Sequence, residues 1–258
     1  MGLSLQMAQH FLLCLALGLG LFSPLADTAK TGVGFYKVIL AVMGGALSLS
    51  FALHLPYHEM LSIHSGLYFL AFGILLSLFY LHKDRRGPLM WVFYATKIVA
   101  LALISFLFAQ KNGMNYLYLI SSMLFLGSVT LTMILGHWYL VTPKLSERPL
   151  LQGLKMIWFI AGLKIALGLW DHFQMQVLPG PEATASMGIS GASLQLVVVA
   201  MRVIWGYVIT IVLSYFAWRL VKMRSLQSAT GIFYVMTFFV FVGETISAFL
   251  FYQDGLML

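Results

Sequence analysis

The chain has 258 residues, of which 61% are hydrophobic and only 9% are charged, and its mean hydropathy is +0.93. A soluble domain carries roughly a quarter charged residues, so this composition excludes the soluble globular class. The single cysteine, Cys14, excludes an internal disulfide and any cysteine-based metal or iron–sulfur site. We interpret the formal net charge of +7 as basic loops beside a membrane, with no nucleic acid as a partner.

Apolar runs of ~20 residues, each long enough to cross a ~30 Å hydrocarbon core, follow one another along nearly the whole chain. We therefore predict an all-α, polytopic integral membrane protein with eight transmembrane helices in a single membrane domain and no soluble domain. The predicted spans cover residues 5–25, 35–55, 60–81, 89–109, 115–141, 153–172, 194–220 and 231–252. We expect the first run to be a retained helix and not a signal peptide, because no Lys or Arg precedes it.

Basic residues divide unequally between the two sets of connections. The connections after spans one, three, five and seven, with their helix ends, hold eleven of them: Lys30, Lys37, Lys83, Arg85, Arg86, Lys144, Arg148, Lys155, Arg219, Lys222 and Arg224. The opposite side holds only Lys111. The positive-inside rule then predicts an inner (plasma) membrane protein with these connections in the cytoplasm and both termini outside, in the periplasm.

Four of the predicted spans carry an ionisable residue at a similar depth in their outer halves. At 1.5 Å per residue, Lys164, Arg202 and Glu244 each lie eight residues, or roughly 12 Å, from the outer ends of their spans. His64 lies four residues, or roughly 6 Å, from the outer end of its span. Ionisable residues inside a membrane are costly and mark functional sites, so we predict that Lys164, Arg202 and Glu244 face a common interior.

One carboxylate cannot neutralise two cations, and the excess charge favours an anionic or carbonyl-bearing guest such as a quinone head group, a propionate of haem b or a small anion. The predicted ligand-binding residues are Lys164, Arg202 and Asp171, and the predicted catalytic proton carriers are Glu244, His64 and His172. The structural alternative is that Glu244 only pairs with a cation while lysine side chains extend toward the headgroups.

The histidines support two further hypotheses. His54, His58 and His64, with Glu59, would bring imidazoles and a carboxylate together near the outer surface, as a zinc or copper site does. In a haem site, His58 or His64 would ligate iron opposite His172, and an inner site would pair His82 with His137. The alternative is that they are solvated interfacial residues, and that His137 in Gly-His-Trp-Tyr is an interface anchor. Lys97 lies nearer the cytoplasmic half and forms a separate feature.

No nucleotide-binding loop, Ser-His-Asp arrangement or cysteine pair can be read in the sequence. The preferred prediction is a membrane subunit of a respiratory or electron-transfer assembly that handles a quinone or an electron/proton step, among membrane lipids and other membrane subunits. The eight-span plan resembles that of quinone-handling integral subunits of respiratory complexes, a fold-level analogy from which no residue is transferred. The alternatives are a small transporter for an anionic or lipid-like solute and a non-catalytic assembly or scaffold subunit.

Overall fold

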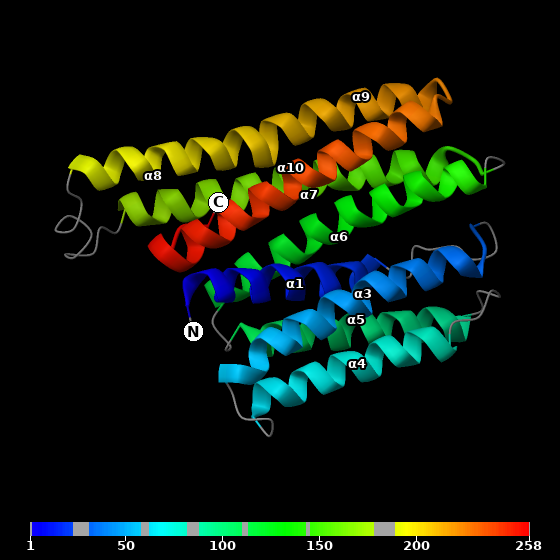
Figure 1. Ribbon diagram of the computed structural model, residues 1–258, viewed down its shortest axis with the longest axis horizontal. Helices are drawn as coiled ribbons and strands as arrows, with labels where there is room; N and C mark the ends of the chain where they lie inside the picture. The colour runs from blue at the N-terminus through cyan, green and yellow to red at the C-terminus, as the bar shows by residue number, and fades with distance from the viewer. Residues whose placement is uncertain are drawn as a thin grey trace.

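The computed structural model describes residues 2–22, 31–57, 62–81, 88–109, 113–142, 145–177 and 189–257, and their regular structure is all helical. The helices are α1 (Leu3–Phe22), α3 (Val33–His54), α4 (Ile63–Leu81), α5 (Pro88–Phe108), α6 (Gly113–Val141), α7 (Arg148–Val177), α8 (Ile189–Met201), α9 (Thr210–Lys222) and α10 (Leu226–Asp254). A 3-10 turn, η2 (Leu55–Tyr57), follows α3, and a π-helical segment, η3 (Arg202–Ile209), joins α8 to α9. Because α8, η3 and α9 form one continuous helix, these residues make eight long helices (Figure 1). The all-α prediction is confirmed.

Six helices are long and apolar enough to cross a membrane. Their apolar stretches are Leu3–Phe22, Gly34–His54, Asn115–Val141, Arg148–Asp171, Gln195–Lys222 and Leu226–Gln253. The apolar stretches described in α4 and α5 are shorter, Ile63–Ile74 and Val92–Phe108. Length and composition thus confirm the prediction of a multi-pass membrane protein.

Several helices begin before the apolar runs that predicted them, and α7, α8 and α10 each begin five residues earlier. The sixth helix, α7, starts at Arg148, and Pro149 fits its first turn because the N–H groups there have no intrahelical partner. The last helix starts at Leu226 and ends at Asp254, where Gly255 takes the left-handed conformation (φ 70°) that commonly closes a helix. Polar residues extend both helices because backbone hydrogen bonding does not require apolar side chains.

The helices run alternately up and down, with α1 inside the bundle (Figure 1). This helix contacts α3, α5, α6 and α10. On one side of it lie α7, the continuous α8–α9 helix and α10, and on the other lie α3, α4 and α5 (Figure 1). The first helix is therefore part of the core, and most of its second half is buried.

The contact between α1 and α6 depends on two glycines. A Cβ atom added at Gly18 would overlap the backbone carbonyl of Met123, and one added at Gly127 would overlap the backbone of Gly18. Small residues let helix backbones approach in a membrane, where van der Waals packing rather than the hydrophobic effect holds helices together. Gly18 and Gly127 therefore set the distance between these helices.

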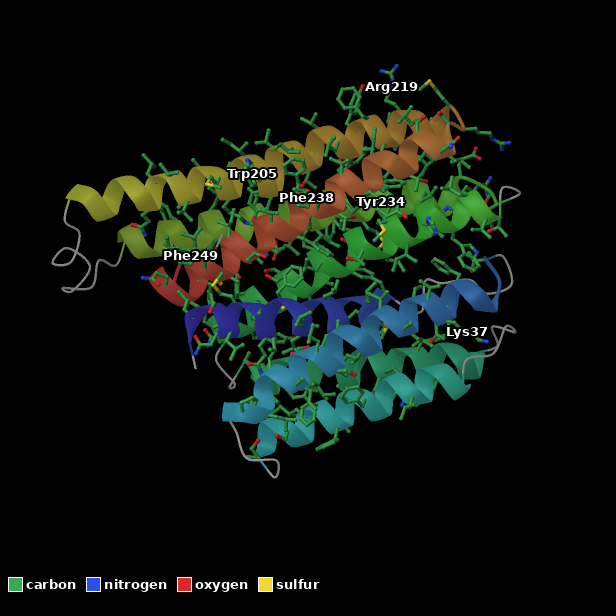
Figure 2. All side chains as sticks on the ribbon, viewed as in Figure 1. Lys37, Trp205, Arg219, Tyr234, Phe238 and Phe249 are labelled. Carbon is green, nitrogen blue, oxygen red and sulfur yellow. The ribbon has the colours of Figure 1, made fainter. Side chains whose placement is uncertain are left out.

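The outer surface of the bundle is apolar along its length and basic toward one end. Phe238 is 59% exposed, and Figure 2 shows it with Trp205 on the outside of the helices. Lys37 and Arg219 both lie toward the right-hand end of that view. This distribution matches a surface that faces lipid in its middle and water or headgroups at its ends.

An ion pair joins two connections at this end. Arg224 Nη2 lies 3.1 Å from Glu147 Oε2, so the residues before α7 contact the turn between α9 and α10. The carboxylate of Glu147 also accepts a hydrogen bond from its own backbone N–H. That bond and the positive charge of Arg224 lower the pKa of Glu147. The pair is exposed to solvent, so it contributes little to stability and mainly shows that these connections share one end.

Candidate functional site

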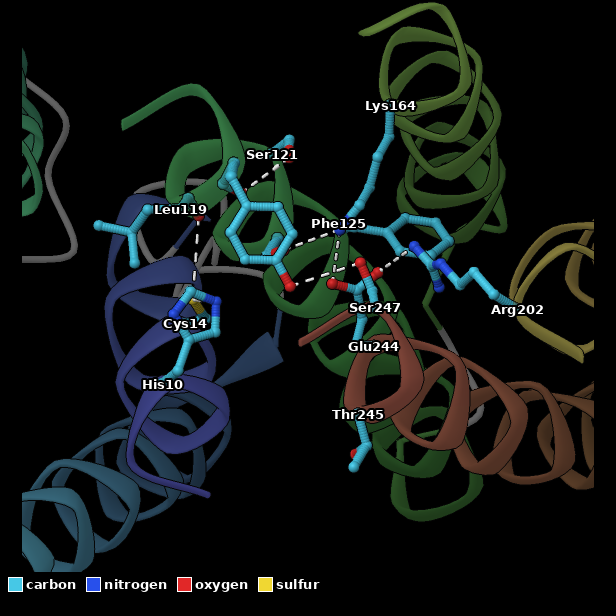
Figure 3. Close-up of polar contacts among 12 residues, drawn as sticks. His10, Cys14, Leu119, Ser121, Phe125, Lys164, Arg202, Glu244, Thr245 and Ser247 are labelled. Carbon is cyan, nitrogen blue, oxygen red and sulfur yellow. Dashed lines mark hydrogen bonds and ion pairs between the residues drawn. The ribbon is translucent and has the colours of Figure 1, made fainter. Parts of the chain in front are cut away.

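Three charged side chains meet inside the helical bundle. Lys164 on α7 donates from Nζ to Oε2 of Glu244 on α10 at 2.6 Å, and Arg202 donates from Nη2 to Oε1 of the same carboxylate at 2.7 Å. Figure 3 shows Lys164 and Arg202 reaching Glu244 from separate helices. Each oxygen of one carboxylate therefore binds one cation. We call these three residues the charged triad.

The charged triad is enclosed by protein. Arg202 is 0% exposed, and Lys164 and Glu244 are each 3% exposed. Two formal positive charges and one negative charge leave a net charge of +1. Burying ions in a medium of low dielectric constant costs several kcal/mol per ion, so the triad requires close pairing and additional hydrogen bonds.

Hydroxyl groups and aromatic rings supply those additional contacts. Nζ of Lys164 donates to Oγ of Ser122 at 2.7 Å and lies 5.5 Å from the centre of the Tyr118 ring. Nη2 of Arg202 donates to the hydroxyl of Tyr207 at 3.0 Å, and its guanidinium carbon lies 4.4 Å from the centre of that ring. Cation–π contacts of this kind stabilise desolvated cations, so each cation has a second partner besides Glu244.

Two glycines make room for Arg202. A Cβ atom added at Gly206, one turn along the same helix, would overlap its guanidinium group. A Cβ atom at Gly243 would lie 2.6 Å from Cα of Gly206 and 2.9 Å from Nη1 of Arg202. Arg202 also begins the π-helical segment η3, and π-helical turns are frequent at functional sites. Local backbone geometry and the two glycines together admit a buried guanidinium between η3 and α10.

A second group of polar side chains adjoins the charged triad, and the sequence analysis did not identify it. Tyr118 donates to Ser247 at 3.4 Å and stacks on the imidazole of His10, with ring centroids 5.1 Å apart. Nδ1 of His10 lies 3.1 Å from the hydroxyl of Tyr252, and Nε2 lies 3.4 Å from Sγ of Cys14. Polar residues inside apolar runs are the signal that could have indicated His10 and Ser122.

His64 occupies a separate polar cluster formed by α1, α3 and α4. Its ring centroid lies 6.1 Å from that of His54 and 6.2 Å from that of Phe108. Nδ1 of His54 is 3.2 Å from Nε2 of Gln9, which also donates to the hydroxyl of Tyr68 at 3.0 Å. The structure thus brings together two imidazoles of the predicted zinc or copper site, His54 and His64.

The other predicted residues have different surroundings. Oδ2 of Asp171 accepts a hydrogen bond from the backbone N–H of Met257 at 3.0 Å, so this carboxylate fixes the residues after α10. Nδ1 of His137 lies 2.8 Å from the hydroxyl of Tyr234. Lys97 lies in the middle of α5. This helix packs mainly against α1, α4 and α6, whereas the charged triad lies on α7, η3 and α10.

Parts of the metal and haem hypotheses fall outside the described residues. His58, Glu59 and His82 lie there, as does the side chain of His172, whose backbone belongs to α7. Within the described part of the chain, no three His, Cys, Asp or Glu side chains gather as ligands for one metal ion. The metal site at His58, His64 and His172 stays a prediction, and so do both haem sites.

Length, hydropathy and the enclosed charges define an α-helical multi-pass membrane protein with a buried ion network. Comparison with protein-family models, with curated proteins and with solved structures found no match.

Proposed function

We propose that this chain is an integral membrane subunit of a respiratory or electron-transfer assembly, and that it handles a quinone or an electron/proton step at the charged triad. In this proposal all eight helices cross the inner membrane, with both termini in the periplasm. The single observation that carries it is the net charge of +1 on Lys164, Glu244 and Arg202, which are buried together. A quinone carbonyl or a propionate of haem b would accept hydrogen bonds from such a site.

Side chains beside the triad are candidates for proton transfer in this step. The ring of Tyr118 on α6 contacts the lysine ammonium, and the imidazole of His10 on α1 stacks on that ring. The hydroxyl of Tyr252 on α10 lies 3.1 Å from Nδ1 of His10. Tyrosine hydroxyls and imidazoles both donate and accept hydrogen bonds, so the Tyr252–His10 contact suits proton transfer, whereas the other two are ring contacts. Glu244, as the carboxylate of the site, would be the group whose charge changes during turnover.

Two alternatives use the same observations differently. A transporter for an anionic solute would use the excess positive charge as its binding site. A scaffold subunit would use the triad only to join α7, η3 and α10, since both oxygens of Glu244 already bind cations. The proposal predicts that quinone or haem is bound to the protein, whereas neither alternative requires one, so the cofactor content distinguishes them.

The first test measures cofactor content. Protein extracted from native membranes in mild detergent should contain quinone on solvent extraction, or a Soret band in its visible spectrum if haem is bound. Lys164→Met should lower that content about tenfold, equivalent to about 1.4 kcal/mol of binding free energy. The variant should still fold, because it leaves the neutral pair of Arg202 and Glu244.

Lys155→Met provides the matched control, since Lys155 is an exposed lysine on the same helix. It should retain the wild-type cofactor content. Wild-type protein that carries neither quinone nor haem would contradict the proposal and favour the transporter or scaffold function. Equal cofactor content in Lys164→Met and Lys155→Met would show that a cofactor binds elsewhere.

The second test concerns orientation. Cysteines introduced at Gln253 and Ser228 would both be exposed on α10, about 38 Å apart at 1.5 Å per residue. The native Cys14 is fully buried and should not react. A membrane-impermeant maleimide should label Gln253→Cys in intact cells or spheroplasts, and Ser228→Cys only after permeabilisation. The reverse pattern would place the termini in the cytoplasm.

A further inference from the structure

Lys97 is a cation in the middle of a peripheral helix. It is the tenth of the 21 residues of α5, about 14 Å from the start of that helix and about 16 Å from its end. Its Nζ lies 5.2 Å from the centre of the Phe93 ring, which is one turn away on the same helix. The side chain is half-buried, and Thr96 beside it is exposed. The ammonium therefore lies at the edge of the bundle, where α5 meets its surroundings.

Within the described residues, no carboxylate forms an ion pair with the Lys97 ammonium. Glu147 pairs with Arg224, Asp171 binds the backbone of Met257, and Glu244 binds the other two cations of the bundle. These three are the acidic residues whose side chains are described. Apart from Thr96, the exposed residues described on the same helix are apolar, including Val99 (57%) and Leu103 (59%). A lone ammonium in such a surface is costly in hydrocarbon unless an acidic group pairs with it.

We propose that Lys97 marks an interface with a transmembrane helix of another membrane protein, which carries an Asp or Glu side chain near the middle of the bilayer. The apolar residues of α5 would pack against that helix, and the ion pair would set its depth and rotation. The inference rests on the proposed function for two premises, namely that α5 crosses the membrane and that the chain belongs to a larger assembly.

Two other occupants fit less well. A lipid phosphate lies at the membrane surface, and the four-carbon stem of a lysine is much shorter than the distance from Lys97 to either end of α5. A second copy of this chain, related by a two-fold axis across α5, would bring the two Lys97 side chains together. Like charges repel in a low-dielectric medium, so a symmetric dimer through this face is unfavourable.

The test uses site-specific photo-crosslinking in native membranes. A photoreactive amino acid is placed at Ala100, one turn from Lys97 on α5, and at Phe216, which is 53% exposed on α9 and serves as the control. The crosslinked peptide is identified by mass spectrometry. We expect the photoreactive residue at position 100 to crosslink to a transmembrane peptide that carries an Asp or Glu in the middle of its span. We expect no such product from the photoreactive residue at position 216.

Charge variants then test the pair itself. Lys97→Met should reduce the Ala100 product at least about tenfold, while Lys97→Arg, which keeps the charge, should retain it. Lys97→Glu combined with a lysine at the partner's acidic position should restore it. The inference would be overturned if the crosslinked product contained lipid alone, a second copy of this chain, or a helix that lacks an acidic residue. It would also be overturned if Lys97→Met gave as much crosslinked product as the wild type.

The purified variants should elute and melt as the wild type does, because the ammonium has only the Phe93 ring as a partner within the described residues. Cofactor content should be unchanged in Lys97→Met, since Lys97 lies outside the charged triad. Failure of the interface would thus be seen in crosslinking alone, whereas failure of the proposed function would be seen in the cofactor content of wild-type protein.

Discussion

Glu244→Gln is expected to lower the free energy of unfolding by about 3–5 kcal/mol, the usual cost of removing one partner from a buried ion pair. The amide keeps the size of the side chain but removes the negative charge that faces Lys164 at 2.6 Å and Arg202 at 2.7 Å. Two buried cations then remain without a carboxylate. Denaturation in detergent, followed by circular dichroism, measures the loss.

Lys164→Met and Arg202→Met should each cost less than Glu244→Gln. Either change leaves one cation paired with Glu244, so the net charge of the site falls from +1 to zero. Each variant leaves one hydroxyl without its donor, that of Ser122 or that of Tyr207. Arg202→Met also removes the guanidinium that fills the space beside Gly206 and Gly243, so it should cost more. The expected order of stability is therefore Lys164→Met, then Arg202→Met, then Glu244→Gln.

A double-mutant cycle tests whether the charges act together. Adding Lys164→Met to Glu244→Gln should recover part of the lost stability, because it removes one of the two unpaired cations. Thr245→Val is the control, since Thr245 is the next residue on α10 and its side chain is exposed. If Glu244→Gln is as stable as Thr245→Val, the triad is not a structural counter-ion network. Loss of turnover at full stability would identify Glu244 as a proton carrier.

Gly18→Ala is expected to destabilise the protein by about 3 kcal/mol or more, at the upper end of the range for overpacking. The added methyl group would overlap the carbonyl of Met123 and approach the backbone nitrogen of Gly127. Backbone atoms cannot rotate out of the way as side chains do, so α1 and α6 must separate. The change should lower the melting temperature and the yield of folded protein from membranes.

Gly45→Ala gives the matched comparison. Gly45 lies on α3, is exposed, and has nothing within 4 Å of the position that a Cβ would take. Alanine there should be neutral or stabilising by about 0.5–1 kcal/mol, because it restricts the unfolded chain. If Gly18→Ala melts at the same temperature as Gly45→Ala, the close approach of α1 to α6 does not govern stability.

The class of the protein and the residues at its centre follow from the sequence. Apolar runs of membrane length predict the helices, since a backbone in hydrocarbon must satisfy its own hydrogen bonds. Lys164, Arg202 and Glu244 stand out in those runs because charged residues are otherwise rare there. Their similar depth follows from the constant rise of an α-helix, so counting residues was sufficient to predict that they could meet.

The tertiary structure decided which side chains share a site. Depth along a helix can be counted, but the direction in which a side chain points depends on how each helix is rotated and packed. Thus His64, predicted at a similar depth, lies beside His54, while His10 from the first helix reaches the surroundings of the charged triad. Gly206 and Gly243 likewise make space for Arg202 only because η3 and α10 pack closely against each other. Such contacts join residues distant in the chain, and no local pattern in the sequence encodes them.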